Sequence, residues 1–211
     1  MLAGLDLRGP AGRGAILRAV EAGAQAIGLV DGIYEHEPAV WHKEILYALA
    51  QGVPVLGAAS MGALRAAECA AFGMVGVGSI FREYLKGVRT ADADVAVAHG
   101  PAEFGYQPLS VALVDAESAL AALPLAPRDR ARLVARARAL HFKDRTWDAI
   151  CRDDRLAAAA AAIPSRKTSD AVGLIGLLRE SQFARPPQFE LNVTGYLTGL
   201  ARDLGIRLSR S

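Results

Sequence analysis

Two short apolar runs, each followed by a segment with helical periodicity, constrain the fold of this 211-residue chain more than any other feature. Residues 26–30 form the first run, which ends at Asp31-Gly32, and residues 53–57 form the second. An uninterrupted apolar run of this length, bounded by turn residues, is typical of a strand buried on both faces of a parallel sheet. Helical spacing of apolar residues over 16–24, 39–51 and 61–72 completes the pattern. The order of elements therefore predicts an α/β fold with a small parallel sheet flanked by helices.

The pattern changes along the rest of the chain. A helix is expected at 79–87 and a third strand at 94–98, which would place His99 directly after that strand. Residues 73–78 are rich in glycine but lack the spacing of a phosphate-binding loop, so we interpret them as a loop lining a narrow groove. From residue 108 onward we expect helices, interrupted by prolines, at 110–123, 128–142, 146–162 and 168–183 and after Phe189. This indicates an α/β core at 1–107 and a helical region at 108–211 that packs on it as one compact domain.

Charge and cysteine content exclude several classes of protein. The net charge is only +2, which argues against a nucleic-acid binder, because neutralising phosphates requires a dense basic surface. The two cysteines form no C-x-x-C motif, which is typical of a reduced, cytoplasmic protein. The first residues lack the features of a signal peptide, and no apolar run reaches the ~20 residues that span a bilayer. We expect a cytoplasmic protein with no membrane segment.

The most informative stretch for chemistry is residues 53–65, in which a predicted strand runs through a tight turn into a helix. Ser60 lies at the turn, in the frame Ala58-x-Ser60-x-Gly62, which resembles a nucleophile elbow with one glycine replaced by alanine. The backbone N–H groups of Met61 and Gly62 would point outward there and could stabilise an oxyanion. The alternative is that Ser60 only caps the helix, and the turn by itself favours that interpretation.

A nucleophilic serine needs a base, and the candidates are His36, His42 and Lys43 on the preceding strand-to-helix segment. Only four of the 24 basic residues are lysines, and lysine can lose its proton when desolvated whereas arginine cannot. The alternative for Lys43 is an ordinary exposed lysine. Asp31 and His99 follow predicted strands, where α/β sheets place ligand-contacting groups, although a turn residue and a capping or core histidine are the simpler interpretations.

Other features are less specific. No spacing of His, Cys or Glu matches a zinc motif, so we expect neither a metal nor another cofactor. Arg128, Arg132 and Arg136 share one side of a predicted helix. That pattern is typical of a solvated face, and the alternative is a surface that docks an acidic protein partner.

Several long motifs, taken in order, resemble the core of TfuA-like proteins over residues 26–105. They are AIGLVDG at 26–32, PAVWHKEIL at 38–46, GAASMGALRAAE at 57–68, FGMVGVGSIF at 72–81 and VAVAHGP at 95–101.

The resemblance implies a role in peptide backbone thioamidation, together with an ATP-dependent YcaO protein that activates the peptide amide. It further implies hydrolysis of the thiocarboxylated C-terminus of a ubiquitin-like sulfur carrier, ThiS, by a Ser–Lys pair at Ser60 and Lys43. We then expect Lys43 to be desolvated against Trp41 or Tyr47. The glycines expected to wall a slot for the carrier's tail are Gly32, Gly57, Gly62 and Gly76. The alternatives are a non-catalytic adaptor that binds YcaO and its peptide, and a serine esterase acting on small acyl substrates.

Overall fold

The computed structural model describes residues 4–32, 38–180 and 183–209, and its contacts divide the chain into two compact units. The first unit combines Met1–Val88 with Asp170–Ser211, and the second is Arg89–Ser169. The boundary that we expected at residue 107 thus differs from the observed division, because the chain returns to the first unit after the second one.

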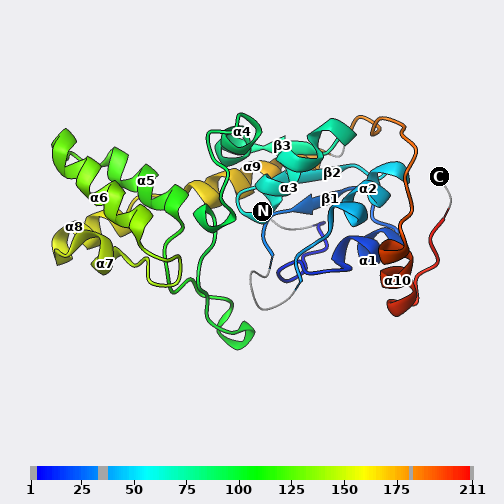
Figure 1. The fold of residues 1–211 in the computed structure, drawn as a ribbon, viewed down its shortest axis with the longest axis horizontal. Helices are drawn as coiled ribbons and strands as arrows, with labels where there is room; N and C mark the ends of the chain where they lie inside the picture. Colours follow the sequence, from blue (N-terminus) through cyan, green and yellow to red (C-terminus); the bar gives the residue numbers. More distant parts are fainter. Residues whose placement is uncertain (1–3, 33–37, 181–182, 210–211) are drawn as a thin grey trace. The chain divides into compact units, whose positions relative to one another are not determined.

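A three-stranded parallel sheet lies at the centre of the first unit, which confirms the α/β fold. Its order is β1 (Ile27–Leu29), β2 (Val55–Ala58) and β3 (Val75–Val77). In the parallel registers, Gly28 pairs with Leu56, and Gly57 pairs with Gly76. Both apolar runs predicted as strands are therefore strands, and both strand-to-strand connections contain a helix (Figure 1).

The third strand is not where we predicted it. The glycine-rich passage that we interpreted as a loop contains β3, and the region around 94–98 contains only a short 3-10 helix, η2 (Asp92–Asp94), followed by irregular backbone. The physical reason is that main-chain groups of this segment form their hydrogen bonds outside the sheet. The amide of Ala98 donates to the hydroxyl of Ser110 at 2.7 Å, and the carbonyl oxygens of Val95 and Ala98 accept from Lys167 Nζ, at 2.9 Å, and from the amide of Leu109, at 2.7 Å.

Helices cover both faces of the sheet. On one face, α1 (Ala15–Glu21), α2 (His42–Ala50) and α3 (Met61–Cys69) enclose a core with the side chains of Ile27, Leu29 and Val55. In Figure 1, α2 and α3 lie in front of the strands. The helix α3 continues into a 3-10 turn, η1 (Ala70–Phe72), and α4 (Gly78–Leu85) follows β3.

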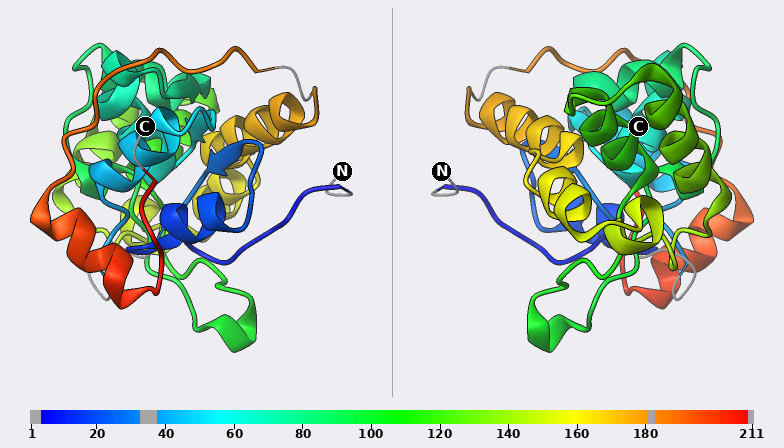
Figure 2. Two further views of the ribbon diagram at one scale, coloured as in Figure 1. Left: turned by 90° about the vertical axis from the view of Figure 1, so that its right-hand side faces the viewer. Right: turned by 90° about the vertical axis from the view of Figure 1, so that its left-hand side faces the viewer.

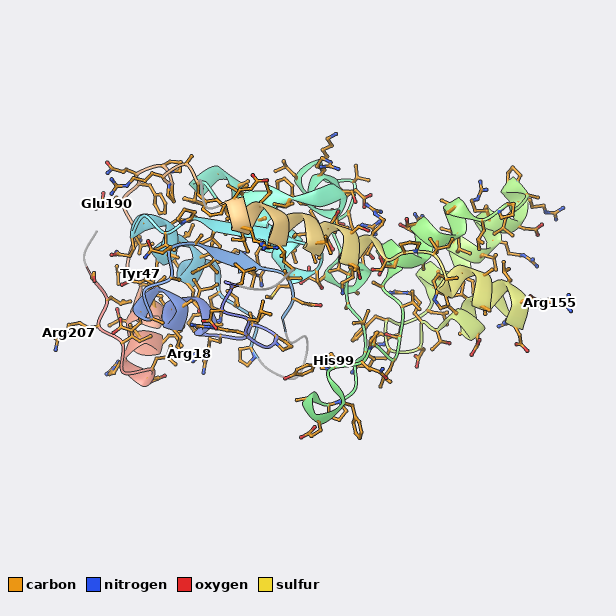
Figure 3. All side chains as sticks on the ribbon, turned by 180° about the vertical axis from the view of Figure 1, so that it is seen from behind. Arg18, Tyr47, His99, Arg155, Glu190 and Arg207 are labelled. Atoms are coloured by element: carbon orange, nitrogen blue, oxygen red, sulfur yellow. The ribbon has the colours of Figure 1, made fainter. Side chains whose placement is uncertain are left out.

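The opposite face is covered by α9 (Arg166–Glu180), which lies in front of the strands in Figure 3. Leu174 of α9 packs with Leu56 and Ala58. A Cβ on Gly28 would overlap the side chains of Leu174 and Leu178, so this glycine allows α9 to approach the sheet. After α9, residues 183–194 run without regular secondary structure to α10 (Gly195–Asp203) (Figure 2).

The second unit is helical. It contains η2, a 3-10 turn η3 (Ala102–Phe104), and the helices α5 (Leu113–Ala122), α6 (Pro127–Ala139), α7 (Trp147–Cys151) and α8 (Asp154–Ala161). The single helix that we predicted over 146–162 is two helices, because Arg152 adopts a left-handed conformation with φ of 57° and Asp153 starts α8 by accepting a hydrogen bond from the amide of Leu156. Arg145 is buried, and its guanidinium donates to main-chain carbonyls that include that of Ala137 at 2.9 Å. Burial lowers the pKa of this guanidinium.

None of the helices in the described parts of the chain is both long enough and apolar enough to cross a membrane.

Candidate functional site

Ser60 lies at the carboxyl end of β2, where the chain turns into α3. The preceding residue, Ala59, has a φ of 68°, a left-handed conformation that is uncommon for a residue other than glycine. Ser60 is 3% exposed, and its side chain makes no capping hydrogen bond to the first turn of α3 in the described structure. The missing capping bond argues against the alternative interpretation, in which Ser60 only caps α3.

The backbone amides around Ser60 are arranged differently from the predicted oxyanion hole. The carbonyl oxygen of Val30 accepts hydrogen bonds from the amides of Ser60, at 3.3 Å, and Gly62, at 3.1 Å. The Gly62 amide thus points back toward the end of β1, and the prediction that it faces outward is corrected. These bonds tie the start of α3 to the strand next to β2. Of the two amides predicted to stabilise an oxyanion, only that of Met61 stays a candidate.

The glycines that we expected to wall a substrate slot allow close packing within the protein, and their role in a slot stays a prediction. A Cβ on Gly62 would overlap the carbonyl oxygen of Leu29, and a Cβ on Gly57 would overlap the carbonyl oxygen of Gly62. A Cβ on Gly32 would overlap the side chain of Met61, and one on Gly76 would overlap the ring of Phe81. These four positions therefore face atoms of the protein itself, and α3 approaches β1 and β2 because side chains are absent there.

Lys43 lies in the first turn of α2, and the structure does not join it to Ser60. The side chain is half-buried, so it is less desolvated than we expected. Its Nζ donates a hydrogen bond to the main-chain carbonyl oxygen of Asn192 at 3.2 Å, and among the described residues this is the only hydrogen-bond partner of the amine. At 100° per residue, Lys43 lies about 160° around α2 from Ile45, which faces the core beneath.

The other candidate bases have separate outcomes. His36 lies outside the described residues. His42 Nε2 lies 2.8 Å from Oε2 of Glu68 on α3, and the same carboxylate oxygen accepts a hydrogen bond from Arg65 at 2.6 Å. Burial acts to raise the pKa of Glu68, but the hydrogen bonds from His42 and Arg65 outweigh it, and the pKa is lowered. His42 is thus held at the outer surface of α3, two turns beyond Ser60.

Sequence reasoning missed the roles of Arg65 and Glu68. Arg65 Nε also donates to the carbonyl oxygen of Val40 at 3.1 Å, which fixes the chain just before α2 against α3. The spacing of the two residues, three apart on a helix, was the available signal, since such pairs lie on one face. Local spacing could not show that Val40 and His42 lie against the face of α3 that carries Arg65 and Glu68.

Asp31 and His99 belong to different units. Asp31 is exposed, and its Oδ1 accepts a hydrogen bond from the amide of Gly32 at 2.8 Å, as in an Asp-Gly turn. His99 belongs to the second unit and follows no strand, so its predicted placement is wrong. It forms an isolated antiparallel bridge with Pro108, and its ring packs edge-on against Tyr106 on the segment labelled in Figure 3.

The three arginines of α6 do not form a uniform solvated stripe. Arg128 and Arg132 are exposed, and Arg132 lies 3.3 Å from the carboxylate of Asp129. Arg136 is half-buried and donates to the carbonyl oxygen of Ile150 at 2.7 Å, so it ties α6 to α7.

A buried carboxylate that sequence reasoning missed lies at the carboxyl end of β3. Asp170 of α9 is 8% exposed and accepts hydrogen bonds from the amides of Ser79, at 3.0 Å, and Ile80, at 2.9 Å. Gly78, with a φ of 94°, leaves the room that this carboxylate fills. Asp170 is 91 residues away from Ser79 in sequence, so no local pattern could have indicated the contact.

The described residues contain no group of three or more His, Cys, Asp or Glu side chains arranged to hold a metal ion. Both cysteines are buried. Burial raises the pKa of the Cys69 thiol to about 11, which disfavours the nucleophilic thiolate at neutral pH.

Comparison with known proteins identifies the family. The sequence model of the TfuA-like protein family matches residues 31–146, more than half of the chain, including Lys43, Ser60 and the Arg65–Glu68 pair. No curated protein matches the chain. The TfuA-like family is generally associated with YcaO proteins. The chain belongs to the TfuA-like family.

Proposed function

We propose that this protein hydrolyses the thiocarboxylated C-terminus of a ubiquitin-like sulfur carrier of the ThiS type. The sulfide released would supply a YcaO protein that thioamidates a peptide backbone. Membership of the TfuA-like family supports this proposal. The structural observation that carries it is the turn at Ser60, in which Ala59, in a left-handed conformation, and the buried Ser60 follow the carboxyl end of a parallel strand.

The proposed chemistry uses Ser60 as nucleophile and Lys43 as base. The neutral Lys43 amine takes the Ser60 proton, the Ser60 oxygen attacks the thiocarboxylate carbon, and the proton passes to sulfur as hydrosulfide leaves. Lys43 then takes a proton from water, the hydroxide attacks the acyl-serine ester, and the proton returns to Ser60 as the carboxylate leaves. The Met61 amide would donate to the oxyanion in both steps. Lys43 must leave Asn192 to take part.

The test is incubation of the protein with thiocarboxylated carrier, followed by intact mass measurement of the carrier. Wild type should replace sulfur by oxygen, and Ser60→Ala should reduce the rate by ~10³-fold or more. Ser169→Ala is the matched control, because this serine is exposed and belongs to the second unit; its rate should equal that of wild type. If the carrier loses sulfur as fast with Ser60→Ala as with wild type, Ser60 is not the nucleophile.

An inactive wild-type protein would contradict hydrolysis altogether. If that same protein accelerated thioamidation by YcaO supplied with free sulfide, the adaptor role would replace the proposal. Both partners, the sulfur carrier and the YcaO protein, are part of this proposal. The experiment supplies them separately so that the effect of each can be distinguished.

A further inference from the structure

Residues 183–194, which we call the strap, connect α9 to α10 along the surface of the first unit (Figure 2). In the described structure, no main-chain to main-chain hydrogen bond involves residues 183–193. The strap is held by side chains instead. Phe189 and Leu191 pack against the core that α1, α2 and the sheet share, and the Phe189 ring lies edge-on to Phe72 with centroids 5.4 Å apart.

With no main-chain to main-chain hydrogen bond at residues 183–193 of the described structure, the strap is held by apolar side chains at Phe183, Pro186, Phe189 and Leu191. A segment of this kind opens at a lower free energy than a helix or a strand. The strap can therefore detach while the main-chain hydrogen bonds of the sheet stay in place. Its contact with the candidate site is the hydrogen bond from Lys43 Nζ to the carbonyl oxygen of Asn192.

That contact has a direction. A carbonyl oxygen only accepts hydrogen bonds, so it binds the Lys43 amine without giving it a proton or taking one from it. In this position the amine donates to the strap, and no hydrogen bond from it to Ser60 is described.

We infer that the strap holds Lys43 in a resting position, and that detachment of the strap releases the amine to act on Ser60. The inference rests on the proposed function, because it assigns regulation to the same Ser–Lys pair. The strap lies beyond the part of the chain that matches the family, so this regulation would be a property of the segment that follows the matched region.

The first test needs no substrate. If the strap holds Lys43, then Lys43 holds the strap to the same extent, because coupling between two sites is reciprocal. Lys43→Ala should speed chymotryptic cleavage after Phe189, which requires the strap to open, by roughly fivefold, the factor for one hydrogen bond of about 1 kcal/mol. Lys86→Ala is the control, since Lys86 is an exposed lysine at the end of α4, and it should leave the cleavage rate unchanged. Equal cleavage rates in the two variants would overturn the inference.

The second test measures hydrolysis. Phe189→Ala removes an apolar anchor of the strap, and Glu190→Ala changes its exposed neighbour, which is labelled in Figure 3. We expect Phe189→Ala to hydrolyse thiocarboxylated carrier several-fold faster than wild type, with Glu190→Ala unchanged. Adding Lys43→Ala to Phe189→Ala should abolish the gain. Leu191→Ala, a second anchor, keeps the test decisive if Phe189→Ala fails to fold.

The outcomes separate the two proposals. If wild type hydrolyses the carrier and the anchor variants are equally active or slower, the strap does not restrain Lys43 and the inference is wrong while the proposed function stands. If wild type leaves the carrier intact, the proposed function fails, whatever the first test shows of the contact between Lys43 and the strap.

Discussion

Glu44 has no exposed surface, and it lies where two helices begin. Its Oε1 accepts a hydrogen bond from the amide of Trp41, just before α2, at 3.1 Å. Among the described residues, its Oε2 has no well-formed hydrogen-bond partner. Burial raises the pKa of this carboxyl, and the amides of Gly14, Trp41, Ile16 and Leu17 oppose that shift. Because burial prevails, the folded protein holds the Glu44 proton more tightly than the unfolded chain does.

This arrangement predicts the sign of a pH dependence. A raised pKa contributes stability below the unfolded value of 4.5, and that contribution is lost as pH rises through the folded value. Glu44→Gln carries no charge at any pH, so its free energy of unfolding should exceed that of wild type at pH 7, and the excess should shrink toward pH 4. Urea unfolding across this pH range measures the difference.

Glu190→Gln is the control, because Glu190 is exposed. A Glu44→Gln variant that is less stable than wild type at pH 7 would mean that the ionised carboxylate is bound by the helix amides more strongly than burial disfavours it.

At the scale of elements, α4 depends on a residue that is remote in sequence. Its own first residues supply no capping side chain in the described structure, and the carboxylate of Asp170 accepts the amides of Ser79 and Ile80 instead. The negative charge also lies at the positive end of the helix dipole. One side chain therefore stabilises α4 and attaches α9 beside β3.

Asp170→Ala should lower the free energy of unfolding by about 3 kcal/mol, since two amides lose a charged acceptor in a buried position. Asp170→Asn keeps one carbonyl oxygen and should lose about half as much. Urea unfolding measures both variants, with Asp203→Ala as an exposed control. Equal stability of Asp170→Ala and the control would show that water replaces the carboxylate without loss.

The elements also show what local sequence can predict. The strands β1 and β2 and the helices around them were predictable because each carries its own period of apolar residues. The strand β3 was not, because Val75-Gly76-Val77 is short and glycine-rich and becomes a strand only through its register with β2. The break between α7 and α8 depends on the backbone of Arg152, which periodicity does not report.

At the scale of the whole molecule, the second unit has its own core. It is built from buried residues of α5 to α8, with Ile150 completely buried among them. Ile150→Ala should destabilise this unit by about 3 kcal/mol, because it leaves a cavity in a closely packed core. Hydrogen exchange should rise within Arg89–Ser169 and stay unchanged at β1, β2 and β3.

Leu56→Ala is the reciprocal variant, since Leu56 is buried in the first unit. It should raise exchange in the sheet and leave α5 to α8 unchanged. Exchange that rises throughout the chain in either variant would show that the two units unfold as one.

Long-range contacts set the limit of prediction for the candidate site. Ser60 was found because strand, turn and helix are adjacent in sequence. The partner of Lys43 is 149 residues away from it, and the partners of His42 and of Ser79 are also on other elements. Residue spacing identified which side chains could react, but it could not show which of them the fold brings together.

The return of the chain to the first unit has a consequence for synthesis on the ribosome. The second unit is complete once residue 169 has emerged, whereas the sheet made earlier lacks the cover of α9 and the strap until residues 170–211 follow. The first unit is therefore translated first but completed last, and until then one apolar face of the nascent sheet is not covered by α9. A chain truncated at the end of the family match would lack this cover and also α7 and α8 of the second unit.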